Sequence, residues 1–183
     1  MPRPFWSSGI ASGPGSESPS PPPPPPPPTR SERVLGHRLT SEIEIEAEAE
    51  RVWAILTDFG AYPEWNPFVR AIEGALAPGA RLAVLLQPSG TRAMAFRPTL
   101  QVVEAPRELR WLGRVLMPGI FDGEHRFVIE VLGAGRLRFE QSERFSGILV
   151  PFMRRSLDRD ARRGFAEMNA ALKARAEGGA GTA

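Results

Sequence analysis

The segment 41–69 constrains the fold most, because a short strand runs directly into a short helix and then into an aromatic corner. Ile43 and Ile45 alternate with glutamates, which is the pattern of a strand with one buried face. In residues 47–59 the apolar side chains recur every three or four positions, as on an amphipathic helix. The prolines of YPEWNPF then prevent a continuous helix. We expect a strand, two short helices and a compact turn in which Asn66 caps backbone groups.

The rest of the sequence has the pattern of an antiparallel meander that ends in a long helix. Turn residues separate six further strands, expected at residues 69–75, 81–87, 91–104, 108–117, 124–132 and 136–145. After Gly147, apolar residues recur at spacings of four and three as far as Leu172, and Pro151 falls in the first helical turn. The sequence therefore predicts an α+β fold, with a seven-stranded curved antiparallel sheet around a long C-terminal helix.

This order of elements resembles the START-like, helix-grip superfamily, and in particular the SRPBCC proteins of the polyketide cyclase/dehydrase type. The similarity continues through ELRWLGRVLMPGIFDGEHRF (108–127), FEQSERFSGILVP (139–151) and the final helix. We expect the domain to span residues 33–177. The resemblance implies a fold rather than an activity, because family members bind lipids, sterols, polyketides or hormones and only a minority are enzymes.

The N-terminal segment 1–32 has the composition of a disordered, proline-rich tail, and we expect disorder again at 178–183. Twelve of the 20 prolines lie in the first 30 residues, and eight of these are consecutive, at 21–28. Proline fixes φ and has no N–H, so the run favours an extended polyproline II spacer. The same run also fits a ligand of an SH3- or WW-type domain, although composition favours a linker.

Composition and charge exclude several functions. A formal charge of +2, from 23 basic and 21 acidic residues spread along the chain, does not suggest nucleic-acid binding. The absence of cysteine removes disulfides, thiol catalysis and thiolate metal sites. No apolar run approaches the roughly 20 residues needed to span a bilayer, and no signal peptide is evident. We expect a cytoplasmic monomer or weak dimer without membrane insertion, metal or cofactor.

The predicted sheet curvature holds the final helix away from part of the concave face, and the space between them would be a cavity for a small hydrophobic molecule. Strand phase places one side of 124–132 and one side of 136–145 inward, because the opposite sides are largely polar. Trp65 and Phe68 lie at the expected mouth. The candidate ligand-binding residues are Trp65, Phe68, Phe96, Trp111, His125, Phe127, Ile129, Phe139, Gln141, Glu143, Met153 and Phe165.

Three of these candidates, His125, Gln141 and Glu143, are polar residues on an otherwise apolar face. They would fix a hydroxyl or carbonyl group of the ligand, or else form a purely structural hydrogen-bond network. A β-bulge that turns Glu143 outward is a further alternative. His37, the other histidine, lies in the poorly structured approach to the domain.

Three functions are consistent with this pattern. The first is binding of a small hydrophobic ligand such as a lipid, a polyketide or an aromatic compound. The second is a cyclase- or dehydratase-like enzyme in which His125 and Glu143 act as a general acid/base pair, and these two residues are the only catalytic candidates. The third is an interaction protein that binds its partner through the polyproline tract.

Overall fold

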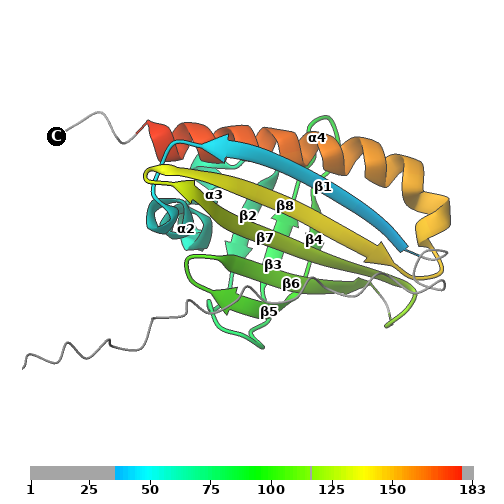
Figure 1. The fold of residues 1–183 in the computed structure, drawn as a ribbon. Helices are drawn as coiled ribbons and strands as arrows, with labels where there is room; N and C mark the ends of the chain where they lie inside the picture. Colours follow the sequence, from blue (N-terminus) through cyan, green and yellow to red (C-terminus); the bar gives the residue numbers. More distant parts are fainter. Residues whose placement is uncertain (1–35, 116, 179–183) are drawn as a thin grey trace, which may run out of the picture.

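Residues 36–115 and 117–178 are described by a computed structural model, in which strands and helices follow the predicted order (Figure 1). The elements are β1 (Gly36–Ile45), α2 (Ala49–Thr57), the 3-10 turn η1 (Phe59–Ala61), α3 (Tyr62–Trp65), β2 (Val69–Glu73), β3 (Ala83–Leu86), β4 (Met94–Phe96), β5 (Thr99–Glu104), β6 (Glu108–Val115), β7 (Phe121–Gly133), β8 (Arg136–Ser146) and α4 (Val150–Glu177). The predicted tail 1–32 lies outside the described residues, as do residues 179–183 of the predicted C-terminal tail.

The strands form two antiparallel sheets. The larger sheet has the order β1-β8-β7-β6-β5, and the smaller has the order β2-β3-β4. Figure 1 shows the large sheet curving along its length, with α4 following β1 and the small sheet behind. The predicted helix-grip α+β fold is therefore confirmed. None of the described helices is long and apolar enough to cross a lipid bilayer.

The predicted strand at 91–104 is wrong in one respect, because it is two strands in different sheets, and the described residues form eight strands instead of seven. Residues Arg97 and Pro98 separate β4 from β5. Pro98 has no N–H to donate to a ladder, so a continuous strand is interrupted there. Its carbonyl instead accepts a hydrogen bond from Leu82 N at 2.8 Å. This break lets β4 turn away from the large sheet.

The first strand begins earlier than the alternation of isoleucines suggests. β1 pairs with β8 over its whole length, from Gly36 opposite Ser146 to Ile45 opposite Leu137. His37 therefore lies inside a strand, and the expectation of a poorly structured approach is wrong. His37 and Ser41 are polar residues at inward positions on either side of Leu39, so hydrophobic periodicity gives only a weak strand signal there.

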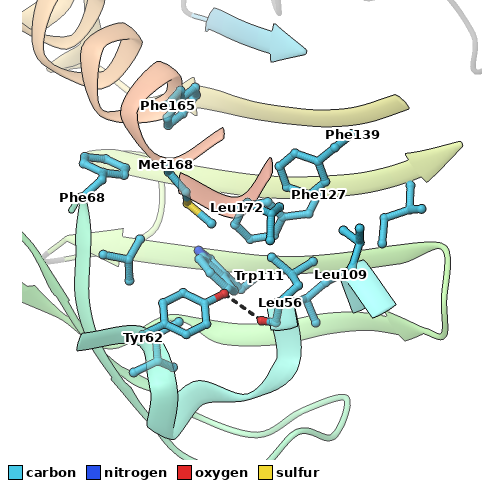
Figure 2. Close-up of a cluster of buried hydrophobic side chains, with 14 of the residues drawn as sticks. Leu56, Tyr62, Phe68, Leu109, Trp111, Phe127, Phe139, Phe165, Met168 and Leu172 are labelled. Atoms are coloured by element: carbon cyan, nitrogen blue, oxygen red, sulfur yellow. Dashed lines mark hydrogen bonds between the residues drawn. The ribbon is translucent and has the colours of Figure 1, made fainter. Parts of the chain in front are cut away.

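Apolar side chains from α4 and the large sheet form one core. Phe165, Met168 and Leu172 of α4 are each 0% exposed, as the apolar stripe of this helix predicts. Figure 2 shows them facing Trp111 and Phe127 of the sheet. Burial of this kind contributes roughly 25 cal/mol per Å² of apolar surface. The core thus fixes α4 across the concave face.

The aromatic corner is held by two local sets of hydrogen bonds. Asn66 Oδ1 accepts from Phe68 N at 3.0 Å and from Val69 N at 2.8 Å, which confirms the predicted cap. The Tyr62 hydroxyl donates to Leu56 O at 2.7 Å (Figure 2), and complete burial raises the pKa of this hydroxyl. The corner is therefore rigid and positions Phe68 against α4.

Candidate functional site

His125, Gln141 and Glu143 lie together on the concave face of the large sheet. His125 of β7 is directly opposite Glu143 of β8 in the antiparallel register. His125 Nδ1 lies 3.1 Å from Glu143 Oε2, and His125 Nε2 lies 3.1 Å from Gln141 Oε1. Glu143 is thus not turned outward by a bulge, and both nitrogens of the imidazole have a partner.

The chain of polar contacts continues from the sheet to α4 and back to β1. Gln141 Nε2 donates to Asn169 Oδ1 at 2.7 Å and to the carbonyl oxygen of Phe165 at 3.4 Å. Asn169 Nδ2 donates to Ser41 Oγ at 3.1 Å. The sequence reasoning missed Asn169 and Ser41. The available signal was a polar residue at position 169, inside the apolar stripe of the last helix.

Aromatic rings hold the imidazole of His125 in place. The His125 ring centroid lies 5.3 Å from that of Trp111, 4.5 Å from that of Phe127 and 5.1 Å from that of Phe165. Rings at these separations make favourable stacked or edge-to-face contacts. The imidazole therefore has little room to rotate, and its two hydrogen-bond directions are fixed.

Glu143 differs from the histidine and the two amide side chains of this hydrogen-bond network because its side chain is partly accessible to solvent. Its side chain is 18% exposed, whereas the side chain of His125 is buried. Glu143 Oε1 has no hydrogen-bond partner among the described residues. A Cβ atom built on Gly123 would lie 2.7 Å from this oxygen. The carboxylate oxygen thus occupies the space that a side chain at position 123 would need, and it packs against the backbone of β7.

Aromatic and apolar side chains surround this end of the sheet. Gly113 is paired with Gly123, and the ring of Phe96 packs into the space that a side chain at Gly113 would need. The rings of Phe121 and Phe145 contact each other at a tilt, with their centroids 5.6 Å apart. The carboxylate is therefore set in a mainly aromatic surrounding.

Beyond Glu143, the connection from β8 to α4 exposes large apolar side chains. Phe152 in the first turn of α4 is 87% exposed, and Ile148 and Met117 are exposed as well. Ile148 N donates to Gly119 O at 3.1 Å, which joins this connection to the loop before β7. An apolar rim thus lies at the same end of β8 as the carboxylate.

A second histidine–carboxylate pair, which the sequence reasoning also missed, lies on the same face. His37 Nε2 is 2.9 Å from Asp158 Oδ1, and the His37 ring stacks on Phe145 at 6.4 Å. Loss of water around Asp158 opposes ionisation, but the hydrogen bond and charge of His37, with the charge of Arg162, hold the pKa of its carboxyl below the usual range. The pair ties the start of β1 to α4.

The other predicted lining residues belong mostly to the core. Phe68, Trp111, Phe127, Ile129, Phe139 and Phe165 are buried, whereas Trp65 and Phe96 are partly buried. The side chain of Met153 lies outside the described residues. A depression of about 460 Å³ exists elsewhere, between α2, the β5–β6 turn and the end of β7, and Ile129 is its only predicted residue. The deep part of the concave face is therefore packed, and Glu143 marks its accessible end.

In residues 36–115 and 117–178, no group of three or more histidine and carboxylate side chains is arranged to hold an ion. His125 and Glu143 are joined to each other by their 3.1 Å contact.

The architecture and its concave face define a helix-grip domain. The family described as "Polyketide cyclase / dehydrase and lipid transport" matches residues 36–177, and the chain belongs to this family. A comparison with curated protein sequences gives no match.

Solved structures share the fold at low sequence identity. The di-domain ARO/CYC StfQ from the steffimycin biosynthetic pathway has a TM-score of 0.68 at 13% identity, over 83% of this chain, which spans only 55% of the StfQ chain. The Zhui aromatase/cyclase from Streptomyces sp. R1128 has a TM-score of 0.65 at 15% identity, over 78% of this chain and 94% of that one. A START superfamily protein from Mycobacterium smegmatis has a TM-score of 0.60 at 23% identity, over 78% and 98%.

Proposed function

We propose that this domain binds a small, mainly apolar molecule that carries one polar group, and that this group contacts Glu143. The observation that carries the proposal is the partly exposed carboxylate of Glu143, whose Oε1 lies beside Gly123 without a partner among the described residues. Such a polar atom on an apolar surface is typical of small-molecule sites, in which a few polar groups orient the ligand.

Two further observations support a ligand at this position. The exposed apolar rim formed by Met117, Ile148 and Phe152 would cover the hydrophobic body of a ligand. Membership of a family named for polyketide cyclisation and lipid transport favours a ligand of the same character. The proposed ligand class is a lipid, a polyketide or an aromatic compound.

Binding is tested by native mass spectrometry of the purified chain and by fluorescence titration with Nile red, a neutral hydrophobic dye. Gly123→Val would place side-chain atoms where Glu143 Oε1 now lies, would displace the carboxylate, and should weaken dye binding about tenfold or more. Gly133→Val is the matched control, because a Cβ atom at Gly133 contacts nothing within 4 Å. Equal dye affinity in wild type and both folded variants would contradict binding at Glu143.

An acid/base enzyme is the second candidate, and the 3.1 Å contact between His125 and Glu143 favours it. In a dehydration, Glu143 Oε1 would take the proton from the carbon next to a ligand carbonyl, a carbon–carbon double bond would form as the β-hydroxyl group leaves, and Glu143 would return the same proton to that group to give water. Incubation with β-hydroxy ketones, followed by mass spectrometry for loss of water, tests this function. If the wild type turns over these ketones no faster than Glu143→Leu does, the enzyme function is contradicted and only the binding function remains. The polyproline interaction stays a prediction, because the tract lies outside the described residues.

A further inference from the structure

In the hydrogen-bond network behind Glu143, the donors and acceptors can be assigned in turn, beginning from a backbone carbonyl group of α4. The carbonyl oxygen of Phe165 can only accept, so the atom of Gln141 that faces it must be the NH₂ group. The same NH₂ group donates to Asn169 Oδ1. The other end of the Gln141 amide is consequently a carbonyl oxygen, and this oxygen faces His125.

The orientation of Gln141 determines which nitrogen of His125 carries a proton. Gln141 Oε1 has no proton to give, so His125 Nε2 must donate across the 3.1 Å that separates them. His125 Nδ1 then faces Glu143 Oε2, also at 3.1 Å. Two bare acceptors at this distance would repel each other, so one proton must lie between them.

This shared proton can be bound to His125 or to Glu143 Oε2, and in both cases Glu143 Oε1 carries no proton. If it belongs to His125, the pair is an imidazolium and a carboxylate, and Glu143 Oε1 is a bare carboxylate oxygen. If it belongs to Glu143 Oε2, the group is a carboxylic acid, and Oε1 is its carbonyl oxygen. Glu143 Oε1 is therefore a hydrogen-bond acceptor in both forms.

We infer that the ligand of this site presents a hydrogen-bond donor to Glu143, such as a phenol, an enol, an alcohol or an amine, and that a carbonyl oxygen is rejected there. Gln141, Asn169 and Ser41 are positioning residues, because they act on the ligand only through His125 and Glu143. The inference about the ligand rests on the proposed function, whereas the protonation of His125 Nε2 stands without it.

The protonation of His125 can be measured in the free protein by nitrogen NMR of a sample labelled with ¹⁵N-histidine. The chain has only two histidines, so the signals that persist in His37→Gln belong to His125. If this variant fails to fold, contacts between the imidazole and the Trp111 ring assign the signals in the wild type. We expect a proton on Nε2 at neutral pH. A bare Nε2 would overturn the inference.

The ligand class is tested with two probes that differ only in their donor, 2-naphthol and 2-methoxynaphthalene, by titration calorimetry of the full chain. We expect the wild type to bind 2-naphthol at least about tenfold more tightly, and Glu143→Leu to bind both probes equally. Equal affinities in the wild type would overturn the donor inference but keep the binding function. Failure of both probes to bind would overturn the proposed function and, with it, the ligand class.

Discussion

The ring of Phe68 lies against the backbone of α4 at Gly164, in the space that a Cβ atom on residue 164 would occupy. Glycine in the middle of a helix ordinarily costs up to about 1 kcal/mol relative to alanine. Its presence here lets the aromatic corner approach α4, and Phe68 packs edge to face on Phe165 with the centroids 5.9 Å apart. The aromatic corner can thus pack closely on α4 only because residue 164 has no side chain.

Gly164→Ala should destabilise the domain by about 1–3 kcal/mol, although alanine is the better helix former. The reason is overpacking, because Phe68 is buried and its ring cannot move away freely. Urea unfolding measures the change. In the double variant with Phe68→Leu, the smaller side chain should restore part of the loss. A more stable Gly164→Ala would mean that the corner adapts at little cost.

Acid should weaken the pair formed by Glu108 and Arg126, whose Nη2 lies 2.6 Å from Glu108 Oε2. This hydrogen bond, with the charges of Arg126 and Arg110, holds the pKa of the Glu108 carboxyl below its usual value of 4.5, against the opposing effect of burial. The folded state therefore favours the ionised form. Its contribution to stability is complete above pH 4.5 and is lost as the pH falls through the lowered pKa.

Glu108→Gln should accordingly lower the urea midpoint at pH 7 and flatten its dependence on pH below about 4.5. Glu104→Gln is the matched control, because the pair of Glu104 and Arg107 is exposed on both sides and should contribute little. If the urea midpoint of Glu108→Gln falls with pH as steeply as that of the wild type, the acid sensitivity comes from other carboxylates.

The sequence pattern was sufficient for those parts of the site that depend on strand phase. Alternation along 124–132 and 136–145 placed His125, Gln141 and Glu143 inward, and the short hairpin between these strands allowed His125 to lie opposite or diagonal to Glu143; the structure places it directly opposite. A period of two and a short turn leave few other registers. The shared face of these residues was therefore predictable from the sequence, whereas the contact between His125 and Glu143 comes from the structure.

Other features depend on packing between distant elements, which periodicity does not contain. The partners of Gln141 come from α4, 28 residues away for Asn169, and Asn169 in turn reaches Ser41 across 128 residues. The interruption at Pro98 was visible as a proline, but its consequence, a separate small sheet, is a tertiary effect. Likewise, the alternation of apolar residues along the strands shows which side chains face inward, but it does not show whether they line a cavity or pack in the core.

Removal of residues 1–32 should leave the thermal midpoint unchanged. A segment rich in proline, serine and glycine has too little apolar surface to offset the entropy lost on ordering. Differential scanning calorimetry of the shortened chain beside the full chain tests this expectation. A midpoint lower by several degrees would indicate that Phe5 or Trp6 packs on the domain.

The last prediction separates the roles of His125 and Glu143. His125→Ala should cost about 2–4 kcal/mol, because it removes a ring packed between Trp111 and Phe165 and leaves Gln141 Oε1 unpaired. Glu143→Gln should cost less than about 1 kcal/mol, because the side chain keeps its shape and is partly exposed.

Urea unfolding of both variants supplies the comparison, and Glu140→Gln, on the opposite face of the same strand, is the control. A small cost for Glu143→Gln, together with loss of the 2-naphthol preference in Glu143→Leu, would mark Glu143 as a residue retained for the ligand. Equal and large costs for His125→Ala and Glu143→Gln would instead make the pair structural. In that case the buried chain from Ser41 to Glu143 would serve to fix α4 on the sheet, because each removed partner leaves a buried polar group unpaired.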